Sequence, residues 1–284
     1  MKNLIWLLGA MDPEMECIWK FLLALGEQVI FATKNGRRVT SGEAYEADPI
    51  DAFSTGALYE AILVECRALV FDSFDSSGRG VPTTLIDHHN PGDPGYGRDP
   101  SEFWTASSLG QVVEALRERD QLPAGWEIPH EFRLAAAADH CLGHAYAGRC
   151  PGVIPEDLWR WRLASRAAFQ KRSVDALIED AKSSMFKINT AKWLNLSPVV
   201  AVRDLRGQAC PELPEAQARS GVSVLCDGMP GHDRRQKINC MGDREACAAF
   251  FPWAAKNGVI DTYGDPARGI VGGYLAARQV EPIN

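Results

Sequence analysis

Residues 83–90 have the sequence TTLIDHHN, in which a short apolar strand brings an acid and two consecutive histidines into a loop. Residues 91–97, PGDPGYG, are too rich in glycine and proline to continue the strand. Neighbouring strand residues point to opposite faces, so Asp87, His88 and His89 can serve different roles at one strand end. Imidazoles bind divalent metals, and a nearby carboxylate can fix their tautomer. Taken alone, these three residues fit a metal site and a surface turn equally well.

The surrounding apolar segments predict an α/β fold with a parallel sheet. Strands are predicted at residues 4–10, 28–33, 68–72 and 83–86, and helices at residues 18–25, 57–66, 106–119 and 130–147. Strands that alternate with helices form right-handed βαβ units and hence a parallel sheet. In such a sheet, ligands bind outside the carboxyl ends of the strands.

Acids follow two of these predicted strands. Asp12, Glu14 and Glu16 come after the first strand, and Asp72 ends the segment 68–72. Acids in a first helical turn also interact favourably with the helix dipole, which accounts for Glu14 better than for Glu16. Because these acids and the histidines are predicted at the same sheet edge, the metal site becomes the favoured interpretation.

The predicted helix 130–147 carries a further group of polar residues. Asp139 follows four alanines, so its carboxylate lies beside tightly packed backbone. His140 and His144 share one helical face at a spacing of i, i+4, which permits joint metal binding. We favour supporting or core roles for both histidines.

Composition limits the class of partner and the compartment. The chain has 284 residues, 46% of them hydrophobic, and a net charge of −7. An acidic balance disfavours binding to long duplex nucleic acid and leaves room for a small anionic substrate. Eight cysteines show no zinc-type spacing, and the apolar run at residues 4–8 is too short for a membrane span or a usual signal sequence. We therefore expect a reduced, cytoplasmic protein that does not bind a membrane.

The helical pattern lapses at residues 189–197. We predict an N-terminal domain over residues 1–188, a linker over 189–197 and a smaller α/β domain over 198–284. The second domain shows predicted strands at 199–202, 222–226 and 236–240 and predicted helices at 211–219 and 244–256.

In motif order the chain resembles the DHH phosphoesterase superfamily, which is named after the triplet seen here as Asp87-His88-His89. The family's first motif, His-x-x-Pro-Asp-x-Asp, corresponds to residues 10–16, AMDPEME, where glutamates replace both aspartates and Ala10 replaces the histidine. Asp72 matches the second motif and Asp139 the fourth. The late Gly-Gly-Gly-His loop of the DHH-associated substrate domain corresponds to residues 270–274, IVGGY. The resemblance covers nearly the whole chain.

This resemblance implies a site for two divalent ions, Mn²⁺ or Mg²⁺, at oxygen-rich ligands with some imidazole. The implied metal ligands are Glu14, Glu16, Asp72, His88 and Asp139, with Asp72 as the bridge. Because Ala10 removes one ligand from the first site, we expect that site to be the weaker one, unless Asp12 or His140 replaces the ligand.

The implied catalytic residues are Asp87, which orients a histidine, and His89, which faces the phosphate. The implied substrate contacts are Arg79, Arg268, Gly272, Gly273 and Tyr274.

The favoured function is a metal-dependent phosphodiesterase that hydrolyses a short or cyclic nucleotide or oligonucleotide in a cleft between the two domains. One alternative is a small-molecule phosphatase or pyrophosphatase. Another is a non-catalytic relative that binds a nucleotide or a protein partner, which the replacements at Ala10 and Tyr274 would suit. The oligomeric state stays open and includes a homodimer.

Overall fold

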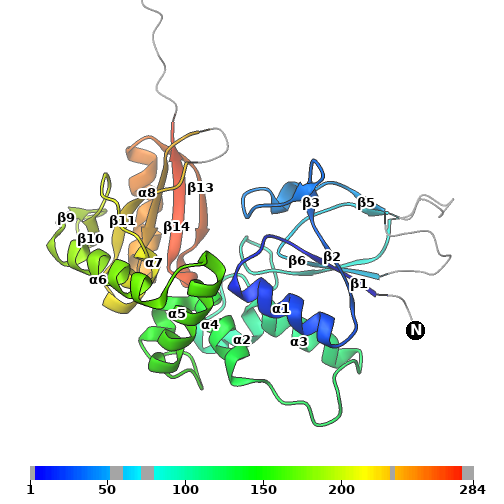
Figure 1. Cartoon of the computed structure of the whole chain (residues 1–284). Helices are drawn as coiled ribbons and strands as arrows, with labels where there is room; N and C mark the ends of the chain where they lie inside the picture. Colours follow the sequence, from blue (N-terminus) through cyan, green and yellow to red (C-terminus); the bar gives the residue numbers. More distant parts are fainter. Residues whose placement is uncertain (1–3, 52–59, 72–79, 231–233, 277–284) are drawn as a thin grey trace, which may run out of the picture. The chain divides into compact units, whose positions relative to one another are not determined.

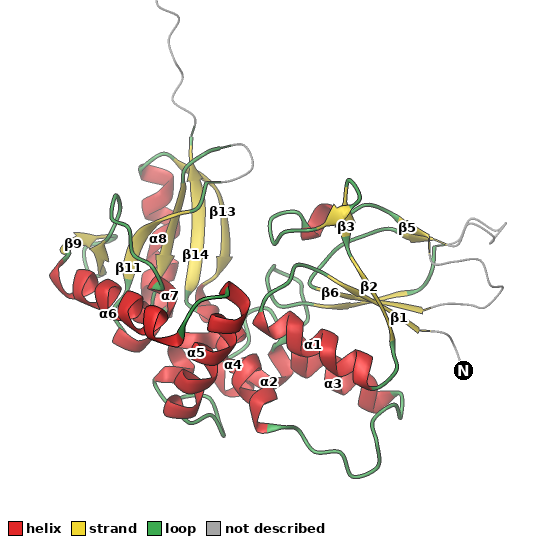
Figure 2. Ribbon diagram, viewed as in Figure 1, coloured by secondary structure: helices red, strands yellow, loops and turns green. Residues whose placement is uncertain are grey.

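The computed structural model describes residues 4–51, 60–71, 80–230 and 234–276. The chain forms two compact units, residues 1–140 and residues 141–284, and each is described here by itself. Figure 2 shows that both contain helices and strands. The α/β class predicted from the sequence is confirmed.

The first unit is built on a four-stranded sheet with the order β2-β1-β6-β8, in which every neighbouring pair is parallel. Its strands are β1 (Leu4–Leu8), β2 (Gln28–Phe31), β6 (Glu60–Val64) and β8 (Thr83–Ile86). All five residues of β1 are buried. A parallel sheet is covered on both faces, and this explains the unbroken apolar run of β1.

Different elements cover the two faces of this sheet. Helices α1 (Pro13–Ala24) and α3 (Ser108–Glu118) pack against each other on one side (Figure 1). On the other face, Leu7 and Leu63 belong to a core cluster with Val39. The elements near that face are β3 (Thr33–Lys34), β4 (Arg37–Arg38), η1 (Ala44–Glu46), and the pair β5 (Ile50–Asp51) and β7 (Val70–Phe71). The unit also contains η2 (Pro100–Glu102), α2 (Phe103–Ala106) and most of α4 (His130–Tyr146).

The helix predicted over residues 57–66 is wrong where the structure describes it, because β6 occupies residues 60–64. Periodicity does not separate a buried strand from a buried helix when the apolar run is this short. The acid that directly follows this central strand is Glu65. The strand predicted at 68–72 is reduced to β7, which pairs with β5 outside the main sheet, and Asp72 lies outside the described residues.

The backbone is tightly packed where β1 and β6 end. The N–H of Gly9 donates to the carbonyl of Val64 over 2.9 Å. A Cβ at Gly9 would lie only 2.3 Å from the carbonyl oxygen of Glu65. Glu65 itself has a φ of +51°, a left-handed conformation that costs a non-glycine residue about 1–3 kcal/mol. Strain of this kind is concentrated at functional sites, and Glu65 lies at the ligand-binding edge of the sheet.

Helix α4 is interrupted at Cys141, where φ is −153° and ψ is 54°. The two compact units divide at the same position, between His140 and Cys141. The part of α4 before the break carries Asp139 and His140.

The second unit contains a six-stranded sheet with the order β13-β14-β12-β11-β10-β9, in which only the β10–β11 pair is parallel. One core cluster includes Phe250 of α8, and another includes Ile188 of α6 and Ala216 of α7. The elements are α5 (Pro155–Gln170), α6 (Val174–Thr190), β9 (Lys192–Asn195), β10 (Ala201–Asp204), α7 (Leu213–Ser220), β11 (Val224–Gly228), β12 (Lys237–Met241), α8 (Arg244–Lys256), β13 (Val259–Asp265), η3 (Pro266–Arg268) and β14 (Ile270–Leu275).

The segment predicted as a linker, residues 189–197, contains the end of α6 and strand β9. Strand β9 pairs antiparallel with β10, so this segment contributes an edge strand to the second unit. The division into domains 1–188 and 198–284 stays a prediction. Across the described ranges, no helix combines the length and apolar character that a bilayer-spanning segment requires.

Candidate metal centre

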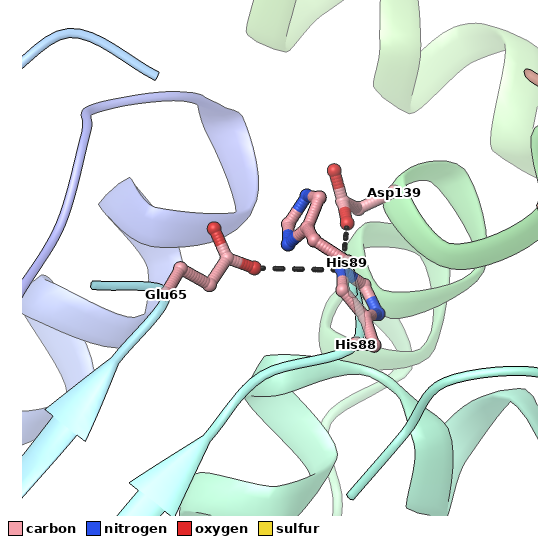
Figure 3. Close-up of side chains that lie close together, drawn as sticks. All are labelled: Glu65, His88, His89 and Asp139. Carbon is pink, nitrogen blue, oxygen red and sulfur yellow. Dashed lines mark ion pairs between the residues drawn. The ribbon is translucent and has the colours of Figure 1, made fainter. Parts of the chain in front are cut away.

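Four side chains from three elements gather at the carboxyl edge of the parallel sheet. Glu65 follows β6, His88 and His89 follow β8, and Asp139 comes from α4. Each offers one donor atom, and these atoms all lie within 4.8 Å of one another. Figure 3 shows Glu65 and Asp139 pointing toward His88 from separate parts of the chain. We refer to these four residues as the donor cluster.

His88 lies at the centre of the donor cluster and is fully buried. Its Nε2 lies 2.9 Å from Oδ2 of Asp139 and 3.5 Å from Oε1 of Glu65. The same Glu65 oxygen accepts a hydrogen bond of 2.7 Å from the hydroxyl of Ser108, at the start of α3. Carboxylate and imidazole donors therefore converge on one point with fixed orientations.

Two more acids lie beside the donor cluster, at the start of α1. Asp12 caps the helix and accepts a hydrogen bond of 2.7 Å from the N–H of Met15. Glu14 is buried, and its Oε1 accepts a hydrogen bond of 3.1 Å from the N–H of Leu109. Within the described part of the chain, Oε2 of Glu14 is buried and has no hydrogen-bond partner. A buried carboxylate oxygen without a donor is a suitable ligand for a cation.

The acids of this region repel one another. Burial, followed by repulsion from Asp139, raises the pKa of Asp12 to about 6. Burial raises the pKa of Glu65, attraction to His89 lowers it, and repulsion from Asp139 and Asp12 raises it. The net result is a pKa of about 8. Burial and the same neighbouring acids raise the pKa of Glu14 well above its usual range. A divalent cation would offset this repulsion, so the residues present fit a metal ion.

The Asp-His-His triplet forms a compact hydrogen-bonded unit. Oδ1 of the buried Asp87 accepts hydrogen bonds from the backbone N–H groups of His88, at 2.7 Å, and His89, at 3.1 Å. The same oxygen lies 2.8 Å from Nδ1 of His89. Burial acts to raise the pKa of Asp87, but the hydrogen bonds from His89 and from the backbone outweigh it and lower this pKa to about 2. Asp87 is thus an anion that holds the His89 ring through Nδ1.

Arg67 links this triplet to the loop that follows it. Its guanidinium donates to Oδ2 of Asp87 over 3.2 Å and to Oδ1 of Asp93 over 2.6 Å. Oδ2 of Asp93 in turn accepts hydrogen bonds from the N–H groups of His89 and Asn90. Both histidines are therefore held by backbone contacts as well as by their rings.

Not every predicted ligand joins the donor cluster. Glu16 lies on α1 and forms an ion pair of 2.6 Å with Lys20, one turn further along the helix. Asp72 and Arg79 lie outside the described residues. The predicted ligands that the structure brings together are His88 and Asp139, with Glu14 and Asp12 beside them.

The remaining predicted substrate residues belong to the second unit. Arg268 ends η3, and Gly272, Gly273 and Tyr274 lie in β14. A Cβ at Gly272 would lie 2.3 Å from the hydroxyl of Tyr263, and one at Gly273 would lie 2.6 Å from a methyl of Val259. Close packing against β13 therefore explains why glycine, with no Cβ, occupies both positions. The Tyr274 and Tyr263 rings lie with centroids 6.0 Å apart.

Sequence reasoning missed Glu65 and Arg38. The available signal for Glu65 was the run Ala-Ile-Leu-Val that precedes it at residues 61–64, which we interpreted as helical. Arg38 donates to the carbonyl of Gly9 over 3.2 Å and stacks on the ring of Phe31 at 3.6 Å. It gave no sequence signal, because a β-hairpin brings it to the end of β1.

Comparison with known proteins gives little further information. No protein-family model and no curated protein sequence matches the chain. Among solved structures, a pGpG-specific phosphodiesterase, PggH, from Vibrio cholerae is similar with a TM-score of 0.40 and 10% sequence identity, over 96% of this chain and 94% of that chain. These values do not show family membership, so the function is inferred from the residues of this chain.

Proposed function

We propose that this protein is a metal-dependent phosphodiesterase that hydrolyses a short or cyclic nucleotide. The observation that carries the proposal is the donor cluster, in which four residues each offer one candidate donor atom and these atoms lie within 4.8 Å of one another at the carboxyl edge of a parallel sheet. The repelling acids beside it, Asp12 and Glu14, add oxygen donors of the kind that Mn²⁺ and Mg²⁺ prefer. The ligands would be Glu65, His88 and Asp139, with Glu14 and Asp12 completing the set.

Divalent ions bound there would activate water and neutralise charge on the phosphoryl oxygens. The chain itself supplies an acid–base group, because Asp87 holds His89 through Nδ1 and leaves Nε2 of that ring to exchange a proton with the substrate. In hydrolases with a carboxylate–histidine pair, the carboxylate likewise orients the ring and the ring transfers the proton. His89 would protonate the leaving oxygen of the phosphodiester.

Arg38 would bind a phosphoryl oxygen at the end of β1. Its guanidinium is fixed by the carbonyl of Gly9 and the ring of Phe31. Among the ion pairs of the described residues, none involves Arg38 and a carboxylate, so its charge is not already neutralised by a direct partner. An arginine held in this way recognises phosphate oxygens through paired N–H groups.

The finer parts of the proposal come from the order of the sequence motifs. They are membership of the DHH phosphoesterase superfamily, manganese as the preferred ion, two ions rather than one, a cytoplasmic location and a nucleotide as the substrate. Under this hypothesis Asp72 keeps its proposed role as a ligand, and Arg79, Arg268 and Tyr274 keep theirs as substrate contacts. The ion pair of Glu16 with Lys20 argues against a ligand role for Glu16.

The test combines metal analysis with a substrate panel. The purified protein is stripped with chelator, reloaded with Mn²⁺ or Mg²⁺, and assayed on linear and cyclic dinucleotides, mononucleotide esters and pyrophosphate. Preferential hydrolysis of the dinucleotides with Mn²⁺ supports the proposal. Hydrolysis of pyrophosphate alone would favour a pyrophosphatase, and nucleotide binding without turnover at any metal concentration would favour a binding protein.

A further inference from the structure

Two cysteines at the start of the second unit lie with their sulfur atoms in contact. Sγ of Cys141 and Sγ of Cys150 are 3.0 Å apart, and the residues are 9 positions apart in the chain. Both are present as thiols, and both are buried. Non-bonded carbon atoms pack at about 3.5–4.0 Å, so these two sulfurs, which are larger atoms, are unusually close. The proposed chemistry does not use this pair.

The backbone around the pair explains why the two sulfurs meet. Cys141 is the residue at which α4 is interrupted. A hydrogen bond of 2.9 Å from the N–H of Arg149 to the carbonyl of His144 closes the end of the helix. The chain then turns over residues 147–152, which we call the return turn. The return turn brings Cys150 beside the break in α4.

The contact is close enough for a disulfide to form with little movement. A disulfide has an S–S bond of about 2.05 Å, so the two sulfurs need to approach by about 1 Å. Cys150 lies in the return turn between two exposed residues, Arg149 and Pro151. A small oxidant can therefore reach its sulfur when this surface turn opens locally. Disulfides that form in a reducing compartment are usually transient and respond to oxidants.

We propose that Cys141 and Cys150 form a reversible disulfide when the protein meets hydrogen peroxide. The sulfur of Cys150 attacks one peroxide oxygen, the O–O bond breaks, and a sulfenic acid and one water result. The sulfur of Cys141 then attacks the sulfenic sulfur, and the S–S bond forms as the hydroxyl leaves in a second water. The two thiol protons end in the waters, the two sulfurs are oxidised and the peroxide is reduced. A dithiol reductant reverses the reaction.

The bond fastens the end of α4 to the return turn. A cross-link of this kind restricts the unfolded chain and thereby stabilises the folded one. Neither cysteine belongs to the donor cluster. The inference is therefore independent of the proposed metal centre, and either one can fail without the other.

A second pair of cysteines provides an internal comparison. Cys240 lies on β12 and Cys247 on α8, and both belong to the core cluster around Phe250. Sγ of Cys247 lies 3.8 Å from the carbonyl oxygen of Cys240. Because regular secondary structure holds both residues inside this core, we expect this pair to stay reduced under conditions that oxidise Cys141 and Cys150.

Peptide mapping of the full chain tests the proposal. Chelator-treated protein is exposed to hydrogen peroxide, its remaining thiols are alkylated in denaturant, and it is digested with trypsin without reductant. Trypsin cleaves after Arg149 and places Cys141 in peptide 134–149 and Cys150 in peptide 150–160. We expect mass spectrometry to find these two peptides joined by a disulfide, and to find them separate and alkylated when dithiothreitol precedes alkylation.

The comparison pair is read in the same digest. Cys240 and Cys247 fall in peptides 238–244 and 245–256, which should be alkylated and separate. A disulfide between these two peptides, with none between 134–149 and 150–160, would overturn the proposal. So would peroxide-treated protein in which Cys141 and Cys150 are only alkylated or singly oxidised.

Thermal melting tests the stabilising effect of the bond. Peroxide should raise the melting temperature of the wild type by several degrees and leave that of Cys150→Ser unchanged. Cys17→Ser, which removes a partly exposed thiol from α1, is the matched control and should respond like the wild type. An equal rise in Cys150→Ser, or joined peptides without any rise in the wild type, would overturn this role of the pair.

Discussion

Nε2 of His88 lies 2.9 Å from Oδ2 of Asp139, although one residue follows a strand and the other lies near the middle of a helix. The contact joins the end of β8 to α4. Glu65 approaches the same nitrogen of His88, so both carboxylates of the donor cluster lie close to this one atom. The proposed function depends on this nitrogen.

Substitution of the donor cluster separates the ligands expected from the structure from those expected from the sequence resemblance. Glu65→Gln and Asp139→Asn should weaken Mn²⁺ binding by at least about 10–100-fold, the loss caused even by residues that only support a ligand. Glu16→Gln, whose carboxylate pairs with Lys20, should bind Mn²⁺ like the wild type. Calorimetric titration checks all three. A large loss in Glu16→Gln together with wild-type binding in Glu65→Gln would contradict the assignment of Glu65.

The metal-free protein should lose stability as pH rises. Glu65 has a pKa raised from 4.5 to about 8 and Asp12 one raised from 3.8 to about 6. The folded protein therefore holds protons on these two carboxyls that the unfolded chain has released, so their contribution to stability is fullest below about pH 4 and is lost as pH rises to about 8. The melting temperature of chelator-treated protein should fall by several degrees between pH 5 and pH 8.

Two measurements test this origin of the pH dependence. Glu65→Gln should show a smaller fall in melting temperature than the wild type, because its amide does not ionise. Mn²⁺ should raise the melting temperature more at pH 8 than at pH 5, because the ion replaces protons on the same carboxylates. Identical pH profiles for the wild type and Glu65→Gln would rule out the proposed origin.

Asp87→Ala should destabilise the first unit by about 2–4 kcal/mol, because several N–H donors lose their buried acceptor. These donors include the backbone groups of His88 and His89 and the guanidinium of Arg67. Chemical denaturation measures the change. Glu102→Ala, which removes an exposed ion pair with Arg98, is the control and should change stability by less than about 1 kcal/mol. Equal effects of the two substitutions would refute the structural role of Asp87.

Arg38→Gln should raise the KM for a phosphodiester by about 10-fold or more, the usual scale for a lost charge-assisted hydrogen bond, with little change in Mn²⁺ affinity. Arg37→Gln provides a matched control on the same strand, since Arg37 pairs with Glu43 instead. Steady-state kinetics and calorimetry give the two quantities. A higher Mn²⁺ dissociation constant with unchanged KM would assign Arg38 to the structure of the sheet edge rather than to substrate binding.

Gly9→Ala should destabilise the first unit by about 1–3 kcal/mol, since the new Cβ must displace backbone. That Cβ would lie 2.3 Å from the carbonyl oxygen of Glu65, so Mn²⁺ binding should weaken in the same variant. Gly143→Ala is the comparison, because a Cβ there has no neighbour within 4 Å. Thermal melting with and without Mn²⁺ distinguishes the two substitutions, and equal behaviour would refute the close approach.

Much of the first unit could be predicted from the sequence. The strands at β1, β2 and β8 and the helices α1, α3 and α4 were expected because their apolar patterns and end signals agree. Strand β6 was interpreted as a helix, and that error also hid Glu65. Local pattern does not show whether a short apolar run will be covered on two faces, since that coverage comes from residues elsewhere in the chain.

Part of the candidate site could also be predicted from the sequence and part could not. The predictable residues are Asp87, His88, His89 and Asp139, whose residue types and positions after apolar segments indicate a site. The contact between Nδ1 of His88 and Nδ1 of His140, 3.1 Å apart, depends on the packing of α4 against the end of β8, which no spacing encodes. The pairing of Glu16 with Lys20 was likewise open, because a glutamate on a first helical turn can face either the site or the solvent.

The break in α4 at Cys141 has a practical consequence for dissecting the protein. A fragment that stops at His140 would place Asp139 in the last turn of an open helix, whose terminal carbonyl groups have no helical partners. Such ends fray, and we expect the contact between Asp139 and the ring of His88 to weaken in that fragment. Residues beyond the break would thus support Asp139, which precedes it. A fragment meant to carry the intact centre should therefore continue past Cys141, next to the end of the first unit.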